Sequence, residues 1–371
     1  MNLLLTLAGR ARTPLSLRTT KAATSALVVL FALAAAPAVT SASSTTWQAP
    51  TRLGGDLDQS LQVSAANEDG AAVAIWEDYA EQGIFASYRS ASGAWGGPEL
   101  AEPGGVQTGH KAVAIDAQGA VTLVYRTCET CGIRARRRAV DGTWSEPAEL
   151  EDFDPLGESQ GNLYARPTSP DVAVAPDGRA TAVWSIGGQG TRQEVIRTST
   201  YENGAWSPAE LLSGGLHAEG DDRVYEHRSV PQVAFDASGR TLVAWTRAFE
   251  DIDDRSDWQR NMVYIETGSR AADADAFAPG AEVTRRTATE TPSDMRMAVS
   301  DAGVATFVWA ALATTGAELR ARRRSAAGVM GDVGIVNGGA TEGQHDHQMP
   351  AVAVTPGGDA TIVWTHVTQN F

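Results

Sequence analysis

Six copies of one short phrase constrain the fold of this 371-residue chain more than any other feature. Residues 171–184 read DVAVAPDGRATAVW, and a glycine and an alanine stand six and eleven residues before the aromatic residue that ends each copy. Because this glycine and this alanine occur in all six copies, the phrase indicates a structural repeat. We call these six the anchor aromatic residues: Trp76, Tyr125, Trp184, Trp245, Trp309 and Trp364.

Each copy predicts two short strands joined by a tight turn. The runs flanking the turn are rich in Val, Ile, Ala and Thr and do not alternate with polar residues, so both faces of these strands should be buried. The glycine, such as Gly178 in Pro176-Asp177-Gly178, suits a hairpin turn because it adopts positive φ without a Cβ clash.

Two further strands are expected after each hairpin. The run IRARRRAV at 133–140 alternates arginines with smaller residues, which predicts an outer strand with its arginines in solvent, an anion-binding patch being the alternative. The phrase GTWSEPAEL at 142–150 carries a proline that belongs on an edge strand. Four-stranded units at this period predict an all-β fold, a β-propeller of six blades over residues 43–371.

The ends of the repeat region suggest how the ring closes. Residues 46–53 read TWQAPTRL, a fourth-strand phrase with no blade before it, so we expect this N-terminal strand to complete the last blade. Few residues follow Trp364, so either the last blade is incomplete or the chain is a fragment, and we favour the fragment.

Residues 1–42 are predicted to be a secretory signal peptide. Four basic residues precede an apolar run at 26–39, and small residues lead to a cleavage site after Ala42. The apolar run is shorter than the roughly 20 residues that span a bilayer, although an uncleaved signal anchor is the alternative. We therefore expect a secreted protein with no membrane span in the mature chain.

Net charge and cysteine content indicate which ligands are excluded and whether a disulfide forms. The formal net charge of −15 argues against nucleic acid and anionic lipid, which both need a positive surface. Cys128 and Cys131 are expected to form a small disulfide, since the chain is predicted to be exported. We expect a monomer.

One turn suggests a family. The segment Asp141-Gly142-Thr143-Trp144-Ser145 resembles a degenerate Asp-box, whose full form is S-x-D-x-G-x-T-W. In sialidases and related propellers this box forms the turn between the third and fourth strands of a blade. Residues 43–371 thus resemble secreted bacterial sialidase-like propeller repeats. The resemblance implies the fold but not the activity, because the arginine-isoleucine-proline segment and the arginine triad of sialidases are not recognisable here.

The longest connections are expected to share one face, where they could bind a ligand. They are residues 152–170, 213–231, 248–261 and 337–350. The segment Tyr225-Glu226-His227-Arg228 combines a phenol, a carboxylate, an imidazole and a cation just before a predicted inner strand. His110 and Arg166 precede inner strands in the same way. Such a ring of side chains could recognise an acidic sugar through arginine–carboxylate pairing.

Two clusters suggest metal sites. A calcium ion is one interpretation of the acidic residues Asp251, Asp253, Asp254 and Asp257, although the EF-hand spacing is missing and a solvated acidic loop is the alternative. Residues 345–347, His-Asp-His, could chelate zinc or copper only with ligands from elsewhere, and an ordinary polar loop is the alternative. No other cofactor is expected.

These observations predict a secreted, non-catalytic propeller that binds an extracellular carbohydrate or protein through its loops. A sialidase-like glycan-cleaving enzyme is the first alternative, and it would need two carboxyls or a Tyr–Glu pair converging on one pocket. A purely structural surface protein is the second.

Overall fold

The described part of the chain is built from strands. In the computed structural model the described residues are 53, 59–78, 83–103, 110–127, 132–152, 166–187, 194–213, 224–251, 262–313, 316–337 and 345–368. They form 23 strands and, within these ranges, no helix, so none that is long and apolar enough to cross a membrane. The chain divides into residues 1–52 and 53–371, and every described strand belongs to the second unit.

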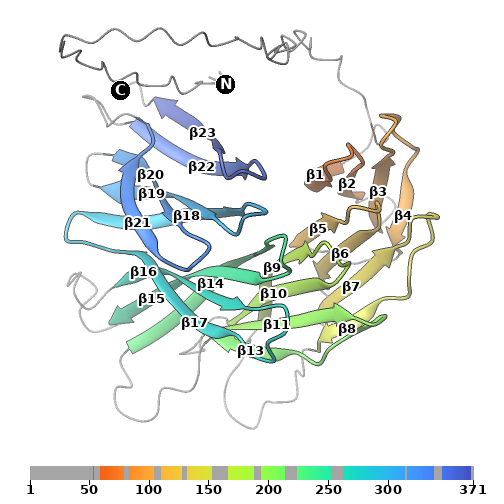
Figure 1. Cartoon of the computed structure of the whole chain (residues 1–371), viewed down its shortest axis with the longest axis horizontal. Helices are drawn as coiled ribbons and strands as arrows, with labels where there is room; N and C mark the ends of the chain where they lie inside the picture. The colour runs from red at the N-terminus through yellow and green to blue at the C-terminus, as the bar shows by residue number, and fades with distance from the viewer. Residues whose placement is uncertain are drawn as a thin grey trace, which may run out of the picture. The chain divides into compact units, whose positions relative to one another are not determined.

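Six antiparallel sheets follow one another in chain order (Figure 1). The first contains β1 (Gln59–Ala66), β2 (Ala72–Asp78), β3 (Gly83–Arg89) and β4 (Glu99–Glu102). The second contains β5 (Lys111–Ile115), β6 (Val121–Arg126), β7 (Ile133–Arg138) and β8 (Ala148–Glu151). The third contains β9 (Arg166–Val174), β10 (Ala180–Gly187), β11 (Val195–Glu202), β12 (Ala205–Trp206) and β13 (Glu210–Ser213).

The remaining three sheets continue the pattern. The fourth contains β14 (Val224–Phe235), β15 (Thr241–Asp251), β16 (Val263–Arg270) and β17 (Ala278–Arg285). The fifth contains β18 (Glu290–Val299), β19 (Ala305–Ala313), β20 (Gly316–Arg324) and β21 (Met330–Ile335). The sixth contains β22 (His345–Val354) and β23 (Ala360–Thr368).

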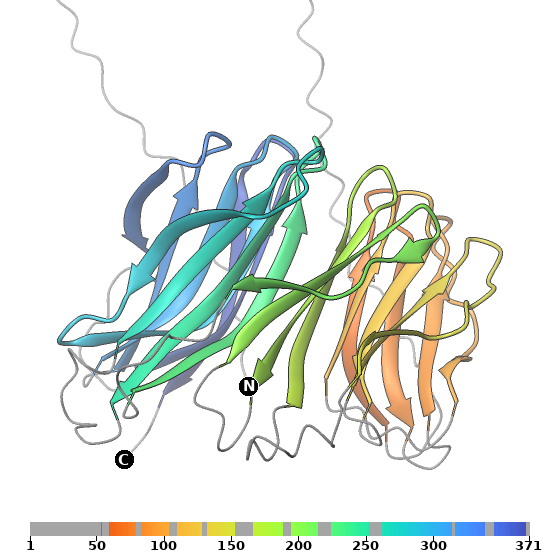
Figure 2. The same ribbon diagram turned by 90° about the horizontal axis from the view of Figure 1, so that it is seen from below.

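The described sheets are arranged side by side, in a manner consistent with propeller blades. The first strand of each sheet contacts the first strand of the next, from β1 through β5, β9, β14 and β18 to β22. Figure 2 shows successive sheets standing side by side in chain order. Apolar side chains of neighbouring sheets form shared cores between them, as Val73 and Ile75 do with Leu123 and Tyr125. No described strand of the sixth sheet pairs with the first sheet. The segment predicted to close the ring lies outside the described residues except for Leu53.

The invariant glycines occupy the predicted hairpin turns. Gly178 and Gly303 have φ of 86° and 77°, a region that favours glycine. A side chain also caps most of these turns: Asp116 Oδ1 accepts a hydrogen bond from Ala120 N at 2.7 Å, and Ser300 Oγ accepts one from Val304 N at 3.2 Å. The glycine that recurs in every copy is therefore required by the geometry of the hairpin turn.

Several first strands begin earlier than the sequence predicted. We expected residues 152–170, 213–231 and 337–350 to be connections that end at a proline. The structure extends β9, β14 and β22 back to Arg166, Val224 and His345. The prolines lie inside these strands at bulges, where two residues oppose the anchor tryptophan of the partner strand and no ladder donor is needed.

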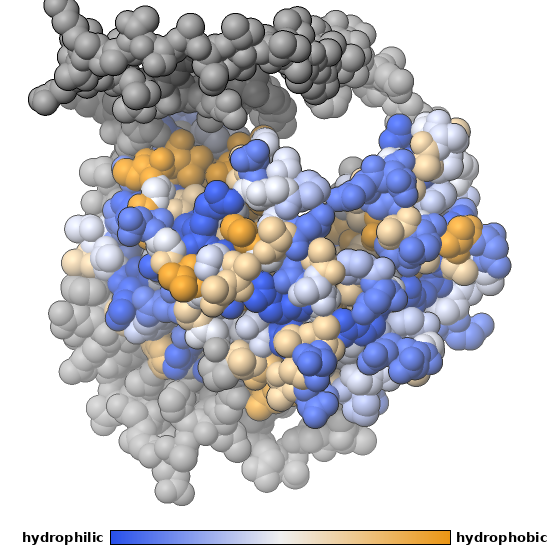
Figure 3. Space-filling model, viewed as in Figure 1, coloured by the Kyte–Doolittle hydropathy of each residue, from blue (hydrophilic) through white to orange (hydrophobic). Residues whose placement is uncertain are grey.

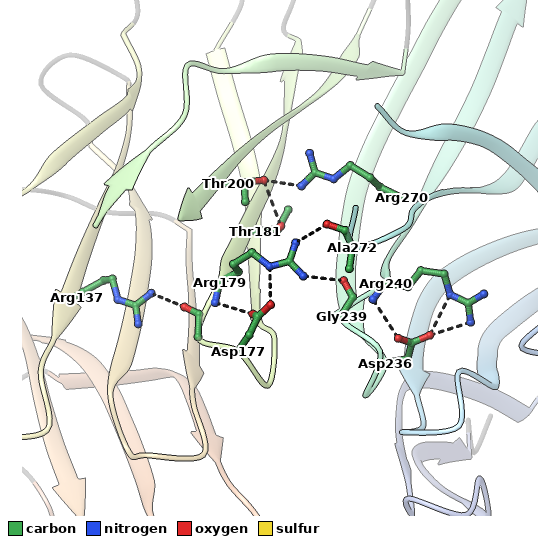
Figure 4. A network of polar contacts seen from close by, with 11 residues as sticks. Arg137, Asp177, Arg179, Thr181, Thr200, Asp236, Gly239, Arg240, Arg270 and Ala272 are labelled. Atoms are coloured by element: carbon green, nitrogen blue, oxygen red, sulfur yellow. Dashed lines mark hydrogen bonds and ion pairs between the residues drawn. The ribbon is translucent and has the colours of Figure 1, made fainter. Parts of the chain in front are cut away.

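The expectation that the outer-strand arginines are solvated is wrong for several of them. Arg138 is 6% exposed and donates two hydrogen bonds to Glu99 of the preceding sheet, at 2.7 and 2.8 Å. Arg137 donates to Gly178 O of the following sheet at 3.3 Å, one of the contacts that link sheets in Figure 4. These arginines join neighbouring sheets because their long side chains reach across the junction.

Exposed apolar side chains gather toward the C-terminal sheets, where the surface in Figure 3 has its largest hydrophobic area. The sixth sheet has two described strands, so the side on which a third strand would pair is open among the described residues. The large apolar side chains exposed there are Leu312, Val329, Val333, Ile335, Met349 and Val363.

Candidate functional site

The pairing of the first and second strands distinguishes two ends of each sheet. The glycine turns lie at one end. At the other, the start of each first strand pairs with the end of the second: Val224 pairs with Asp251, and His345 pairs with Thr368. We call this second end the loop end. The residues predicted to bind a ligand all lie there along the backbone.

The structure describes the side chains of only two of these residues. Arg166 begins β9, and Tyr225, Glu226 and His227 lie in β14, but their side chains are outside the described part of the chain. The two are His110 and Arg228. The proposed ring of ligand-binding side chains stays a prediction.

His110 lies in a mixed-charge group at the second sheet. His110 is exposed, but partial desolvation of its ring, together with the positive charges of Arg126 and Lys111, lowers its pKa. Lys111 is itself buried and forms an ion pair with Glu77 of the first sheet. A neutral imidazole can donate and accept hydrogen bonds, so His110 suits a hydroxyl group better than a carboxylate.

Arg228 is buried at a junction between sheets. It is 7% exposed, and its Nη1 donates to Glu194 O of the third sheet at 3.4 Å. Arg247 is its direct partner in the register of β14 and β15. Binding of an acidic ligand by Arg228 would therefore need this junction to open.

A half-buried group of aromatic residues at the loop end was not foreseen from the sequence. The guanidinium carbon of Arg247 lies 4.3 Å from the ring centroid of Phe249 and 5.9 Å from that of Tyr264. The two rings meet edge to face at 6.0 Å, and Arg247 Nη1 also donates to Glu266 Oε1 at 3.0 Å. We call Arg247, Phe249 and Tyr264 the aromatic cluster.

A cavity of ≈330 Å³ lies beside this cluster, between the third and fourth sheets. Glu266 lines the cavity and also accepts the hydrogen bond from Arg247, so it joins the two features. Trp245 and Phe277 form an apolar wall, and Leu212 and Ser213 of β13 close the side that belongs to the third sheet. Glu282, the register partner of Glu266 on β17, also lines the cavity. The cavity thus combines flat apolar surface with hydrogen-bond acceptors.

The predicted metal and disulfide residues are not tested by the structure. Cys128, Cys131, Asp253, Asp254 and Asp257 lie outside the described residues, as do the side chains of Asp251 and of residues 345–347. Among the side chains that are described, no group of three or more His, Cys, Asp or Glu residues could hold a metal ion.

The turn that resembles an Asp-box lies between β7 and β8. Asp141 Oδ1 accepts a hydrogen bond from Thr143 N at 2.9 Å, and hydrogen bonds from Thr143 lower the pKa of Asp141. Its carboxylate therefore stabilises a turn between the third and fourth strands of a sheet.

Comparison with known proteins supports the fold. No family model matches the chain, and no curated protein matches its sequence. An ulvan lyase from a new family of polysaccharide lyases is similar in structure, with a TM-score of 0.50 and 10% identity over 81% of this chain and 77% of that one. The α-L-arabinofuranosidase of Fusarium graminearum (TM-score 0.44, 11% identity) and a protein of unknown function from Dyadobacter fermentans (TM-score 0.43, 11% identity) each match 83% of this chain and 93% of their own.

Proposed function

We propose that this protein is an exported β-propeller of six blades that binds carbohydrate at its loop end without cleaving it. The observation that carries the proposal is the aromatic cluster beside the interblade cavity. Aromatic rings provide flat apolar surface, and neighbouring polar groups fix orientation, which is how small-molecule sites are usually built. The similarity in fold to a polysaccharide lyase is consistent with a carbohydrate ligand.

Two sources of ligand contacts can act together at the loop end. The first is the aromatic cluster with the cavity, and the second is the predicted ring of His110, Arg166 and residues 225–228. The calcium site at residues 251–257 would lie on the connection that follows β15, close in sequence to Phe249. Calcium would then order that connection rather than contact the sugar.

The first test replaces one ring of the aromatic cluster. Phe249→Ala removes a ring that we expect a sugar to contact, so binding of soluble polysaccharides should weaken about tenfold, equivalent to about 1.4 kcal/mol. Affinity electrophoresis against neutral and acidic polysaccharides, followed by calorimetry on the best ligand, measures the change.

A matched control is available at the opposite end of the sheets. Tyr201 lies under Arg137, whose guanidinium carbon is 4.2 Å from the ring centroid, so it is also a half-buried ring paired with an arginine. Tyr201→Ala should leave binding unchanged. Equal losses in both variants, or no polysaccharide bound by the wild type, would argue for a protein partner or a structural role.

Glycan cleavage is the second candidate because Glu266 and Glu282 line one cavity, and paired carboxylates are the usual machinery of glycoside hydrolysis. Each carboxylate is already engaged by an arginine: Arg247 lies 3.0 Å from Glu266, and Arg285 lies 2.9 Å from Glu282. Binding therefore fits the geometry better. Release of reducing ends from a bound polysaccharide, lost in Glu266→Gln, would favour the enzyme instead.

A further inference from the structure

A second cavity lies between the third and fourth sheets, at the end that carries the glycine turns. Its volume is ≈480 Å³, and Trp206 of β12 forms an apolar part of its wall. Thr200 and Glu210 of the third sheet and Arg270 of the fourth also line it, and the strand pairing places them beside the turns. We call it the turn-end cavity. A ligand bound there would be distinct from the carbohydrate proposed at the loop end.

At the junction of the first and second sheets, the corresponding arginine and glutamate form an ion pair. Arg138 ends the third strand β7, and Glu99 begins the outer strand β4 of the preceding sheet. Two hydrogen bonds of 2.7 and 2.8 Å join them, and the guanidinium carbon of Arg138 lies 4.7 Å from the ring centroid of Tyr88. Arg270 and Glu210 hold the corresponding places, at the end of β16 and the start of β13.

Arg270 and Glu210 are held apart. Arg270 donates to Thr200 Oγ1 at 2.7 Å and stacks on Phe277 at 4.7 Å (Figure 4). Among the described residues, Thr200 is its only hydrogen-bond acceptor, and Glu210 has no ion-pair partner. Thr200 pairs with the second residue of β10 as Tyr88 pairs with the second residue of β2. Because threonine is much smaller than tyrosine, space stays open between the guanidinium and the carboxylate.

The charges on the lining restrict the ligand. Burial lowers the pKa of Arg270, while the carboxylate of Glu210 acts against this shift, so the two groups are close without touching. Arg179 is already engaged, by Asp177 at 2.8 Å and by two main-chain oxygens. A guanidinium has five N–H donors, so Arg270 has donors left for a ligand. The exposed carboxylates of Glu202 and Glu210 can accept hydrogen bonds.

We infer that the turn-end cavity binds the zwitterion of an α-amino acid with an apolar side chain. The carboxylate of the ligand accepts two hydrogen bonds from Arg270, as Glu99 does from Arg138, and its ammonium group donates to Glu210. The apolar side chain lies against the half-buried ring of Trp206. The volume is within the range of ligand pockets, about 300–1,000 Å³. The ligand thus bridges two opposite charges that the fold holds apart.

Ligands with one sign of charge fit this lining less well. Four carboxylates and two guanidiniums line the cavity, so an acidic sugar would be repelled. An amine without a carboxylate would leave the remaining donors of Arg270 without an acceptor. The inference adds a second class of ligand to the proposed function and does not depend on it.

Matched ligands test the need for both charges. Calorimetric titration compares L-phenylalanine and L-leucine with phenethylamine, which lacks the carboxylate, and hydrocinnamate, which lacks the ammonium group. At least one of the amino acids should bind with millimolar affinity or better. Each analogue should bind about tenfold more weakly or worse than phenylalanine, because it loses hydrogen bonds between charged groups. Binding of either analogue as tight as that of phenylalanine, or no binding of either amino acid, would overturn the inference.

Two variants test the location of the site. Arg270→Gln should weaken binding of the amino acid about tenfold or more. Thr200→Tyr, which introduces the side chain found at this position in the first sheet, should fill the cavity and abolish binding. Arg285→Gln is the control, because Arg285 is an exposed arginine of the same sheet that pairs with Glu282 at 2.9 Å. It should bind as the wild type does.

Thermal unfolding of each variant shows whether a loss of binding is a folding defect. A folded Thr200→Tyr that still binds the amino acid, or equal losses in Arg270→Gln and Arg285→Gln, would refute the site. Polysaccharide binding should persist in Thr200→Tyr, since the loop end lies at the other end of the sheets. Loss of both ligands in that variant would mean that the turn-end cavity is not a separate site.

Discussion

Single side chains on the first strands tie neighbouring sheets together. Asp171 of β9 accepts a hydrogen bond from Val233 N of β14 through Oδ2 at 2.8 Å. Gln232 holds the same place after the bulge of the next sheet, and its amide exchanges two hydrogen bonds of 2.7 Å with the main chain of Met295 and Met297. Burial outweighs the hydrogen bonds to Asp171 and raises its pKa to about 6.

This pKa predicts a specific pH dependence of stability. An acid with a raised pKa in the folded state binds its proton more tightly there, so stability should fall as pH rises from about 4 to about 6. Asp171→Asn keeps an oxygen for Val233 N and cannot ionise. Above pH 6 the variant should be more stable than the wild type, by up to about 3 kcal/mol.

Urea unfolding of both proteins between pH 4 and pH 8 measures this difference. The two free energies of unfolding should converge toward pH 4, where Asp171 is protonated in the folded state. A difference that does not change with pH would show that the carboxylate is ionised throughout, contrary to the prediction.

At the scale of the element, a β-bulge in the first strand is the structural feature that recurs from sheet to sheet. Ser169, Val230, Asp294 and Met349 adopt φ of 50° or 51° at the bulges of four sheets, opposite an anchor tryptophan. The second sheet has Tyr125 at that position and a first strand without a bulge within β5. Positive φ is costly for a β-branched residue, so Val230 is the most strained of the four.

Relief of this strain should stabilise the protein. Val230 is 43% exposed, so little apolar burial is lost when it is replaced. Val230→Asn should raise the free energy of unfolding by about 1 kcal/mol, since asparagine tolerates the left-handed region. Val230→Ala, which shortens the side chain but keeps the unfavourable φ, should gain less. Thermal unfolding of the two variants side by side tests the order, and an asparagine variant no better than alanine would contradict it.

The elements also show what the sequence can and cannot predict. Hairpin turns were predictable because glycine and the anchor aromatic residue are fixed by local backbone geometry. The starts of β9, β14 and β22 were not, because a proline in a bulge and a proline before a strand look alike in one sequence. The cavity depends on what a neighbouring sheet supplies. Its lining cannot be read from one repeat alone, because Leu212 and Ser213 come from the third sheet and Trp245 and Glu266 come from the fourth.

At the scale of the molecule, one contact repeats at successive junctions. An arginine donates to the carbonyl oxygen of the invariant turn glycine in the next sheet. Arg137 donates to Gly178 and Arg179 to Gly239, both at 3.3 Å (Figure 4). Arg240 donates to Gly303 at 3.4 Å. Arg323 makes the same contact with Gly358. The glycines therefore serve both their own turn and the arginine of the preceding sheet.

Each sheet contacts mainly its neighbours. The strength of the contact between two neighbouring sheets should therefore determine both the free energy of unfolding and the cooperativity of the unfolding transition. Arg240 also donates to Ala326 O at 2.6 Å and pairs with Asp236, so one guanidinium joins the fourth and fifth sheets through several atoms. Arg240→Lys cannot reproduce this fork and should lower the free energy of unfolding by about 1–3 kcal/mol. Arg134→Lys is the control, because Arg134 pairs with Glu149 inside one sheet in partly exposed surroundings, where an ion pair contributes about 0–1 kcal/mol.

The same variant tests whether the six sheets unfold as one unit. Weakening the junction between the fourth and fifth sheets should broaden the urea transition or split it in two, with the C-terminal sheets unfolding first because they have a single described junction to the rest. Tryptophan fluorescence and far-ultraviolet circular dichroism should then give different midpoints for Arg240→Lys and one midpoint for Arg134→Lys. A single, equally steep transition in Arg240→Lys would mean that cooperativity does not depend on this arginine and is carried by the apolar cores between the sheets.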